Sequence, residues 1–531
     1  MSKVKVLVSD YISDEGIKIL EKEDFEVTYD YKMSREEFLN IIGEYDGIIV
    51  RSFTQLDKEA LDKAEKLKVI GRAGTGFDNI DLEEASKKGI IVFNTPNGNT
   101  ISAAEHTMAL LLSLSRNVPQ ANKALYNGIW DRKKYNGVEL KDKTLGIIGL
   151  GRIGSRVAKY AQAFGMNVIA NDPYIPLSKA ENLNVKLVDF DELLRVSDFI
   201  TLHTPLTDET YHILGEEEFK RMKDNVRIIN VARGKNIDTI ALAEAIKEGK
   251  VAGAALDVFE EEPLSPDHPI LKFEDKVIVT CHLGGTTTEA MDNVSIDAAE
   301  QVVAVLKYGR LPESPLNVYS IEPQVLKKAE PYLQLISKLG NFLARWKGNE
   351  RISAIEIEYG GEMFNSGLKP FTATAIKEIL APVLDHRVNL VNAYIVARER
   401  GISIKESLVK KPDTLSNLVR ITIKTKKGEY SLTGTTLPFG DRLIEINGYR
   451  IDLHLEGNFI VAIYKDQPGV IGKIGTILGN KGINIAYMQV GRNIDTGEAI
   501  SLIQPDTMPS AEIMEEIKKE MDLLDLAYIE I

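Results

Sequence analysis

The chain has almost none of the cysteine that a disulfide-bonded or thiolate-bound metal protein needs. Cys281 is its one cysteine in 531 residues, which excludes an internal disulfide framework and a thiolate metal cluster. We therefore expect no metal site and a reducing, cytoplasmic compartment.

Long hydrophobic runs are also missing. No uninterrupted apolar stretch is long enough to span a bilayer, which argues against a membrane protein. The amino-terminal residues alternate like the start of a strand and lack the pattern of a signal peptide. These features favour a soluble, cytoplasmic protein.

The chain lacks an excess of positive charge. Lys plus Arg total 65 against 78 for Asp plus Glu, so the net charge is −13. A nucleic-acid binder usually carries a basic excess, so this balance argues against nucleic acid as a partner. Since the field of the whole protein repels anions, an anionic substrate would have to be held by a local cluster of basic residues.

What the chain does have is enough length for roughly three or four domains. Up to residue 98, short β-branched runs alternate with helical stretches, a rhythm that predicts a parallel α/β sheet. Its expected strands are 4–9, 26–29, 47–51, 69–71 and 90–93. A long apolar helix is expected at 102–115, and we interpret His106 within it as a structural histidine.

A second α/β unit begins near residue 145 and ends near residue 285. Its expected strands are 145–148, 168–171, 199–203, 227–231, 254–258 and 277–280. The helix expected at 288–308 would return the chain to the first domain. We therefore predict a discontinuous domain, 1–98 plus 286–315, around a Rossmann-like domain at 99–285.

After Pro315 the pattern changes to mixed helix and strand. Residues 317–455 predict an α+β domain, with helices at 330–346 and 372–384 and strands at 418–424 and 448–454. No catalytic spacing occurs in this stretch. Residues 458–531 form a further compact pattern of strands, turns and helices.

The most informative motif is the glycine turn G-x-G-x-x-G at 149–154, between an expected strand and an expected helix at 155–164. In this context Gly149 permits the tight turn, Gly151 lets the backbone approach a pyrophosphate, and Gly154 allows close helix–strand packing. The amino terminus of the helix adds unpaired N–H groups and partial positive charge for the phosphates.

Asp172, 18 residues after Gly154, selects between cofactors. Its carboxylate can accept hydrogen bonds from ribose hydroxyls and would repel a 2′-phosphate, so NAD is favoured over NADP. The turn alone leaves two alternatives: a plain strand–helix turn with a surface aspartate, and a methyl-donor cofactor on the same fold.

Three ionisable residues follow at strand ends or in loops: Arg233, Glu262 and His282. Oxidising an alcohol needs a group that takes the hydroxyl proton, and histidine titrates in the right range when a carboxylate holds its tautomer. An arginine can clamp a substrate carboxylate through two parallel hydrogen bonds. Singly, each residue also fits a surface ion pair, an acidic loop or a helix cap.

Together with the stretches 71–81, 94–96 and 202–206, these residues resemble the D-2-hydroxyacid dehydrogenase family over residues 1–315. The resemblance implies His282 as acid/base, Glu262 as its partner and Arg233 as the substrate clamp. Residues 285–286 depart slightly from common relatives, which leaves these assignments intact. Hydride transfer needs no thiol nucleophile, so Cys281 is interpreted as a packing residue.

The resemblance also implies which residues contact NAD. They are Thr75, Gly149, Gly151, Arg152, Ile153, Gly154, Asp172, Thr204, Val231, Ala232, Arg233, Asp257, His282, Gly284 and Gly285. Asp257 has a plainer alternative, because an aspartate at that place could simply cap a turn.

Arg51 and Arg72 mark a local basic cluster at the ends of two expected strands. Arg132 belongs to a second basic patch at 131–134. In a protein of net charge −13, such clustering suits a doubly anionic substrate, and Gly74 and Asn79 complete the expected substrate residues. The alternative is ordinary surface charge.

Residues 458–531 resemble an ACT domain, a βαββαβ amino-acid sensor, with Tyr464, Asp466 and Asn484 where that family binds its ligand. Residues 317–455 resemble the intervening domain of the long, phosphoglycerate-oxidising dehydrogenases. The resemblance implies oxidation of 3-phosphoglycerate, feedback inhibition by L-serine, side reduction of 2-oxoglutarate, and a homo-oligomer, either a dimer or a tetramer.

The predicted fold class is therefore α/β. It comprises two Rossmann-like or flavodoxin-like parallel-sheet domains, an α+β intervening domain and a carboxyl-terminal ACT domain. Two other functions remain open: a glyoxylate or hydroxypyruvate reductase with the same catalytic unit, and a non-catalytic NAD-sensing regulator. An isolated ACT-type binding module would explain only the last part of the chain.

Overall fold

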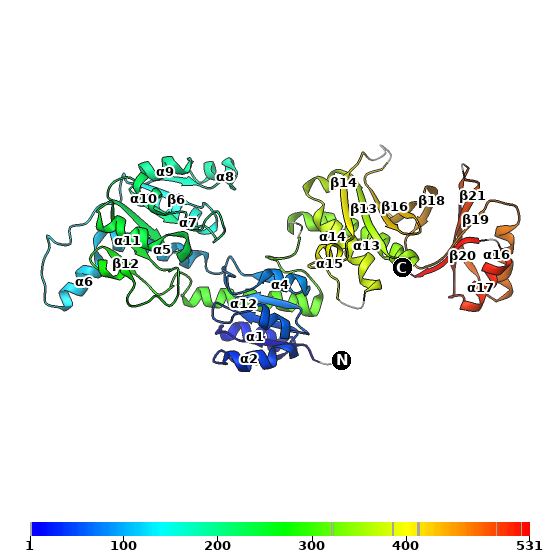
Figure 1. The fold of residues 1–531 in the computed structure, drawn as a ribbon, viewed down its shortest axis with the longest axis horizontal. Helices are drawn as coiled ribbons and strands as arrows, with labels where there is room; N and C mark the ends of the chain where they lie inside the picture. Colours follow the sequence, from blue (N-terminus) through cyan, green and yellow to red (C-terminus); the bar gives the residue numbers. More distant parts are fainter. Residues whose placement is uncertain are drawn as a thin grey trace. The chain divides into compact units, whose positions relative to one another are not determined.

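The computed structural model describes residues 3–319, 321, 323–384, 387–410, 415–494, 496–521 and 523–530. The chain clusters into two compact units, one of Met1–Gln55, Ile70–Ile80 and Asn94–Ser314, and one of Leu56–Val69, Asp81–Phe93 and Pro315–Ile531. Four sheets organise the described residues (Figure 1). None of the helices described is both long enough and apolar enough to cross a membrane.

The first sheet has the strand order β2-β1-β3-β4-β5. Its strands are β1 (Lys5–Val8), β2 (Glu26–Tyr29), β3 (Gly47–Val50), β4 (Val69–Arg72) and β5 (Ile91–Asn94). β1 pairs in parallel with both β2 and β3. Each strand lies within one residue of its expected position. Arg51 directly follows β3, and Arg72 is the last residue of β4.

A late helix packs beside the first one in the chain. The helix α12 (Thr288–Tyr308) has its expected bounds and lies against α1 (Asp14–Lys22). The Ser295 hydroxyl accepts the Ser13 N–H at 3.0 Å. A Cβ at Gly16 would lie 2.8 Å from the Ser295 carbonyl oxygen, so the close approach of the two helices depends on glycine. The remaining helices of this region are α2 (Arg35–Ile41), α3 (Lys58–Lys63) and α4 (Leu82–Lys87).

The second sheet has seven described strands in the order β12-β11-β10-β9-β6-β7-β8, and all its neighbours pair in parallel. The strands are β6 (Thr144–Ile148), β7 (Asn167–Asn171), β8 (Lys186–Leu187), β9 (Phe199–Leu202), β10 (Val226–Asn230), β11 (Val251–Leu256) and β12 (Val277–Val279). The chain leaves β6 toward β7 on one side and later adds β9 on the other. Ligands of open α/β sheets bind at such a reversal of strand order.

Helices cover this parallel sheet, whose strands β6, β9, β10 and β11 are buried along nearly their whole length. They are α5 (Thr100–Arg116), α6 (Val118–Tyr126), α7 (Arg152–Ala163), α8 (Leu177–Asn182), α9 (Phe190–Val196), α10 (Glu216–Arg221) and α11 (Thr239–Lys247). The helix α7 begins three residues earlier than expected, directly after the second glycine of the turn. Its first N–H groups therefore belong to the turn itself.

The third sheet is mixed, in the order β14-β13-β15-β16-β17-β18, and the expected α+β character is confirmed. β13 pairs in parallel with β14, and the other neighbours are antiparallel. Its elements are α13 (Pro323–Lys347), β13 (Ile352–Gly360), α14 (Lys369–Leu380), α15 (Ala393–Glu399), β14 (Ser403–Leu408), β15 (Leu418–Thr425), β16 (Glu429–Leu437), β17 (Gly440–Ile446) and β18 (Tyr449–His454). The helix α13 starts before its expected first residue and continues through Pro331.

The fourth sheet has the order β20-β21-β19-β22 and is antiparallel throughout. Its elements are β19 (Asn458–Lys465), α16 (Val470–Asn480), β20 (Ile485–Asn493), β21 (Glu498–Pro505), α17 (Ala511–Glu520) and β22 (Leu523–Glu530), which is the expected βαββαβ succession. Side chains of β19 alternate between two cores. Phe459 and Val461 pack in the core of α13 and β13, whereas Ile460 and Ala462 pack with α16 and α17.

Candidate active site

The glycine turn after β6 is built as its sequence predicts. Gly149 has φ +91°, and a Cβ there would lie 2.7 Å from the His203 carbonyl oxygen. A Cβ at Gly154 would collide with the Gly149 carbonyl, which is the close helix–strand packing expected of that position. At Gly151 a Cβ would meet no described atom within 4 Å. That open side of the turn is where a pyrophosphate needs room.

Asp172 follows β7 and is held against this turn. Its carboxylate accepts the Leu150 N–H at 2.8 Å and the Tyr174 N–H at 3.0 Å. The carboxylate is thus fixed beside the turn, where a ribose would lie if a phosphate sat on the turn. The Tyr174 hydroxyl in turn donates to Glu209 at 2.7 Å, which joins the loops that follow β7 and β9.

The loop after β9 carries two buried polar atoms that lack hydrogen-bond partners among the described residues. They are the His203 Nδ1 and the Thr204 Oγ1. Burial lowers the pKa of His203 to about 3, so its ring is neutral. An unpaired buried polar atom is costly unless a ligand or water completes it. A dinucleotide would supply these missing partners, because Gly151 leaves room for it and the first N–H groups of α7 have no partner within the helix.

Thr75 lies in a loop that hydrogen bonds to two asparagines hold in place. The Thr75 hydroxyl donates to the Asn99 side chain at 2.7 Å, and the Thr75 carbonyl accepts from Asn94 at 2.6 Å.

The Ala232 N–H donates to the Asn230 side chain at 3.0 Å, which shapes the turn that precedes Arg233. Arg152 and Ile153 form the first turn of α7.

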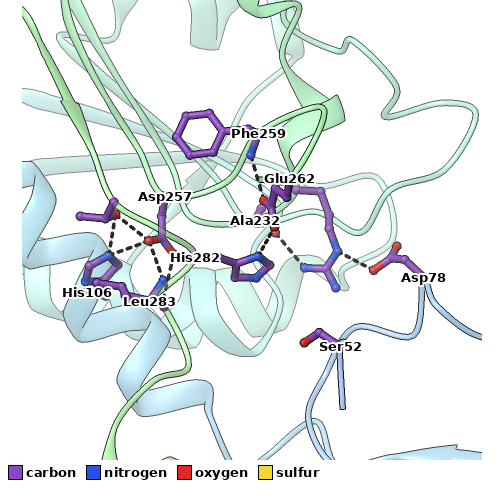
Figure 2. Close-up of polar contacts among 12 residues, drawn as sticks. Ser52, Asp78, His106, Ala232, Asp257, Phe259, Glu262, His282 and Leu283 are labelled. Atoms are coloured by element: carbon purple, nitrogen blue, oxygen red, sulfur yellow. Dashed lines mark hydrogen bonds and ion pairs between the residues drawn. The ribbon is translucent and has the colours of Figure 1, made fainter. Parts of the chain in front are cut away.

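His282 and Glu262 are hydrogen-bonded, with 2.7 Å between the His282 Nδ1 and a Glu262 carboxylate oxygen (Figure 2). The other carboxylate oxygen accepts the Phe259 N–H at 3.0 Å. Burial raises the pKa of Glu262, but the hydrogen bonds from His282 and Phe259 outweigh burial and leave that pKa lowered. The ionised carboxylate requires a proton on Nδ1, so Nε2 is the nitrogen that can accept another.

The backbone of His282 lies in the left-handed region, with φ +57°. Asp257, which is fully buried, holds it there: its two carboxylate oxygens accept the N–H groups of Leu283 and Gly284 at 2.7 and 2.8 Å. Its carbonyl accepts the His282 N–H at 2.9 Å. Such backbone strain persists only where neighbouring contacts fix it. Gly285 follows the same segment and lies against Asn99.

Asp257 also has two side-chain partners, His106 and Thr280. The His106 Nε2 lies 3.2 Å from the carboxylate, and the Thr280 hydroxyl donates to it at 2.6 Å. Burial raises the pKa of Asp257, but these hydrogen bonds and those of the following N–H groups lower it to about 2. The carboxylate expected to contact NAD is therefore fully engaged inside the protein. His106, expected to be structural, touches the loop of His282 through it.

Arg233 is held from two sides. Its Nε donates to Asp78 at 3.0 Å and its Nη1 to the Ala232 carbonyl at 2.8 Å. A Cβ at Gly76 would collide with its Nη2, so the guanidinium lies directly on that glycine. Figure 2 shows these contacts to Asp78 and Ala232 together with the His282–Glu262 pair. Asp78 lies inside the 71–81 motif, but the sequence did not single it out.

Arg51 and Arg72 lie close enough that the charge of Arg51 affects the pKa of Arg72. Burial first, and then the charges of Arg51 and Arg233, lower the pKa of Arg72 to about 10. Arg72 donates to the Ala73 carbonyl at 2.7 Å and to the Ser52 hydroxyl at 3.1 Å. The Nε atoms of both arginines are buried without a hydrogen-bond partner in the described part of the chain. Both residues are half-buried, and a half-buried cationic pair of this kind suits a dianion.

The other expected substrate residues divide into two groups. Asn79 donates to the carbonyls of Arg51 and Thr54 at 2.8 and 2.6 Å, and the Gly74 N–H donates to Thr95 at 2.7 Å. Both therefore support the loops that carry the arginines. Arg132 lies in an exposed turn, and no contact joins it to the arginine pair among the described residues.

The expected ligand residues of the last sheet differ in exposure. Tyr464 is 3% exposed, and its hydroxyl shares a 2.6 Å hydrogen bond with Ser501, which places it in the core. Asp466 and Asn484 are exposed in the loops on either side of α16. Asp466 pairs with Arg492 at 2.7 Å, and Asn484 donates to Asp506 at 2.8 Å.

Three stretches of the chain match family models. Residues 108–284 match the NAD binding domain of the D-isomer specific 2-hydroxyacid dehydrogenases, 328–447 the intervening domain of D-3-phosphoglycerate dehydrogenase, and 459–520 the ACT domain. The D-3-phosphoglycerate dehydrogenases of Archaeoglobus fulgidus and Methanocaldococcus jannaschii are 42% and 44% identical to the chain, and each covers 99% of it. The aligned parts are 100% and 99% of those relatives. The chain belongs to the D-3-phosphoglycerate dehydrogenase family.

The family membership confirms the predicted resemblance, the α/β fold class and the NAD cofactor, and it makes the chain an NAD-dependent D-2-hydroxyacid dehydrogenase. Solved structures resemble about 60% of the chain. A D-lactate dehydrogenase from Aquifex aeolicus, complexed with NAD and lactic acid, is 32% identical with a TM-score of 0.53, over 60% of this chain and 100% of its own. A glyoxylate reductase from Paecilomyes thermophila is 31% identical with a TM-score of 0.56, over 60% and 99%.

Proposed function

We propose that the chain oxidises D-3-phosphoglycerate to 3-phosphohydroxypyruvate with NAD, the first step of L-serine biosynthesis. One observation carries the choice of substrate: the half-buried pair Arg51 and Arg72, whose Nε atoms are buried, in a protein of net charge −13. A 2-hydroxy acid needs one cation for its carboxylate, and Arg233 supplies it. A second, half-buried cationic pair is explained by a phosphate at the far end of the substrate.

The proposed chemistry uses the Nε2 of His282 as the base. Glu262 accepts a hydrogen bond from the Nδ1 of His282, with 2.7 Å between the two atoms. Its charge stabilises the imidazolium that forms when Nε2 takes the hydroxyl proton. Arg233 binds the substrate carboxylate through the guanidinium edge that Asp78 and Ala232 leave free. NAD, held by the glycine turn and Asp172, would supply the acceptor for the hydride that leaves the hydroxyl-bearing carbon. In the reverse direction His282 returns the proton to the keto oxygen.

We further propose that NAD lies along the carboxyl edge of the second sheet. The contacts assigned to it are Thr75, Gly149, Gly151, Arg152, Ile153, Gly154, Asp172, Thr204, Val231, Ala232, Arg233, His282, Gly284 and Gly285. For Asp257 we propose an indirect part, because its carboxylate is engaged by Leu283 and Gly284. The domain limits 1–98 plus 286–315, 99–285, 317–455 and 458–531 belong to the same proposal.

L-Serine is proposed as a feedback inhibitor that binds the ACT domain. Asp466 and Asn484, exposed beside α16, suit the ammonium and carboxylate groups of an amino acid, and Tyr464 would support that loop from the core. A ligand regulates only if it prefers one global state of the enzyme. The homo-oligomer and the side reduction of 2-oxoglutarate, whose two carboxylates suit the same cations, remain parts of this proposal.

A second candidate is a glyoxylate or hydroxypyruvate reductase. The 31% identity to a solved glyoxylate reductase favours it for the catalytic part, since that alignment covers 60% of the chain. That function leaves the half-buried arginine pair and the residues after Pro315 without a role. A non-catalytic NAD-sensing regulator would in turn leave the His282–Glu262 pair unexplained.

The deciding experiment measures kcat/KM with NAD for 3-phosphoglycerate, D-glycerate and D-2-hydroxyglutarate, and in reverse for glyoxylate. We expect 3-phosphoglycerate to exceed D-glycerate by about 100-fold or more, because two charge-assisted contacts to phosphate each contribute about 1.5–3 kcal/mol. Equal values for these two compounds would contradict the proposal. A clear preference for glyoxylate would favour the reductase.

A further inference from the structure

A buried aspartate that the sequence did not single out binds the loop that carries Arg51. Asp10 follows β1 by two residues and is 3% exposed. It shares a cavity of about 280 Å³ with Tyr11, Tyr31 and the loop of residues 51–53. Because β1 and β3 are parallel neighbours, Asp10 and Arg51 emerge at the same edge of the first sheet.

The Asp10 carboxylate binds the backbone of the loop 51–54. It accepts the N–H groups of Arg51 at 2.5 Å, Phe53 at 3.2 Å and Thr54 at 3.1 Å, and the Thr54 hydroxyl at 2.7 Å. A carboxylate has room for about four such donors, and an ionised acceptor forms the stronger kind of hydrogen bond. The loop therefore closes around this one side chain.

The loop controls both arginines. Arg51 is part of it, and the Ser52 hydroxyl accepts from Arg72 at 3.1 Å. Asn79 holds the opposite side of the loop through the carbonyls of Arg51 and Thr54. With Asp10 on the N–H groups and Asn79 on the carbonyls, the loop is fixed from both sides.

The charge of Asp10 also matters. Two guanidinium groups in a buried place repel each other, and burial opposes the charge of each. Burial lowers the pKa of both arginines, and the charges of the neighbouring arginines lower the pKa of Arg72 further. The negative charge of Asp10 opposes these shifts in both residues. Asp10 is a buried anion that does not occupy the guanidinium edges a ligand would need.

We propose that Asp10 is a positioning residue for the phosphate of the substrate: it fixes the loop 51–54 and holds the paired arginines in place before the dianion arrives. This inference rests on the proposed function. It differs from a general structural role because it concerns the phosphate half of the substrate alone.

The test compares 3-phosphoglycerate with D-glycerate, which is the same hydroxy acid without the phosphate. In Asp10→Asn one acceptor oxygen becomes an N–H₂ group that faces N–H donors, and the charge is lost. We expect kcat/KM for 3-phosphoglycerate to fall about 10- to 100-fold through KM, the range set by one charge-assisted contact. For D-glycerate it should change by less than about threefold, within the usual scatter of a remote change.

Matched variants separate positioning from folding. Asp46→Asn makes the same substitution at an aspartate that accepts the Lys5 N–H at 3.1 Å, at the amino ends of β1 and β3, and should leave both substrates unchanged. Thr54→Val removes one donor to Asp10 but leaves its charge and its backbone donors in place, so KM for 3-phosphoglycerate should rise by only about two- to fivefold. If Asp10→Asn does not fold, Thr54→Val carries the test.

The outcomes are distinct. A selective loss with 3-phosphoglycerate supports the inference. An equal loss of kcat/KM with both substrates overturns the inference. The absence of any loss in both Asp10→Asn and Thr54→Val overturns it as well. The proposed function stands in either case. A parent enzyme that oxidises D-glycerate as well as 3-phosphoglycerate overturns the proposed function and this inference together.

Discussion

The Nδ1 of His282 lies 2.7 Å from the Glu262 carboxylate, while the backbone of that histidine is held in the left-handed region by Asp257. Two carboxylates thus act on one residue, one on the ring and one on the main chain. The ring nitrogen on the far side, Nε2, is left for substrate. The predictions about catalysis start from this arrangement.

Replacing His282 by Asn should abolish most turnover but not cofactor binding. General acid–base catalysis by a placed side chain contributes about 10²–10⁴-fold, so kcat should fall by that factor. NADH binding, followed by fluorescence, should change little because the glycine turn is intact. Near-normal turnover would remove His282 from the acid/base role.

Glu262→Gln should lower turnover without loss of cofactor binding. Glu262 accepts a hydrogen bond from the Nδ1 of His282, with 2.7 Å between the two atoms, and hydrogen bonds keep the pKa of Glu262 lowered, so its carboxylate is ionised. A neutral amide cannot stabilise the imidazolium in the same way, so kcat should fall about 10- to 100-fold, the range set by one charge-assisted contact. Unchanged turnover would show that Glu262 does not act on His282.

Asp172→Ala should erode the preference for NAD over NADP. This change removes the carboxylate that the Leu150 N–H holds in place. The side chain can then neither accept a hydrogen bond from a ribose nor repel a 2′-phosphate, so the ratio of kcat/KM with NAD to kcat/KM with NADP should fall about 10- to 100-fold. Asp189→Ala, at the start of α9, provides the control. If the ratio stayed constant, ribose recognition would lie elsewhere.

L-Serine should inhibit 3-phosphoglycerate oxidation, and Asp466→Ala should raise the concentration for half-inhibition about tenfold or more, the cost of one charge-assisted contact. Glu512→Ala, on the exposed first turn of α17, should leave it unchanged. No response of the parent enzyme to serine would sink the feedback proposal, whatever else the ACT domain binds.

Gly16→Ala should destabilise the protein by about 1–3 kcal/mol, because overpacking forces α1 away from α12. Its Cβ would lie 2.8 Å from the Ser295 carbonyl oxygen. Gly472→Ala, in a helix where a Cβ meets nothing within 4 Å, should instead stabilise α16 by up to about 1 kcal/mol. Denaturant unfolding of both variants checks the opposite signs.

Much of the architecture followed from periodicity and turn chemistry. Buried parallel strands such as β3 consist mostly of β-branched residues, and the glycine turn fixes the start of α7 to within a few residues. The strand β13 was missed although Ile352–Gly360 alternates apolar and charged residues. Tyr464 was expected as a ligand residue, but its place in the alternation of β19 puts it with Ile460 and Ala462 in the core.

The residues that sequence reasoning missed act by holding other residues in place. Asp10 accepts N–H groups of the loop 51–54, and Asp78, within the stretch 71–81, accepts the Nε of Arg233. Which N–H groups need an acceptor depends on the path of loops far apart in the chain. One signal was available for Asp10, since it follows its strand much as Arg51 follows the neighbouring strand.

The alternation along β19 limits how this protein can be divided or recombined. Its odd-numbered residues complete the core of α13 and β13, and its even-numbered ones complete the core of α16 and α17. A gene fusion that exchanged the last 74 residues for a foreign domain would therefore expose apolar side chains of the core of α13 and β13, unless the new strand carried matching side chains on both faces. The ACT domain must therefore be exchanged together with the domain that contains α13 and β13.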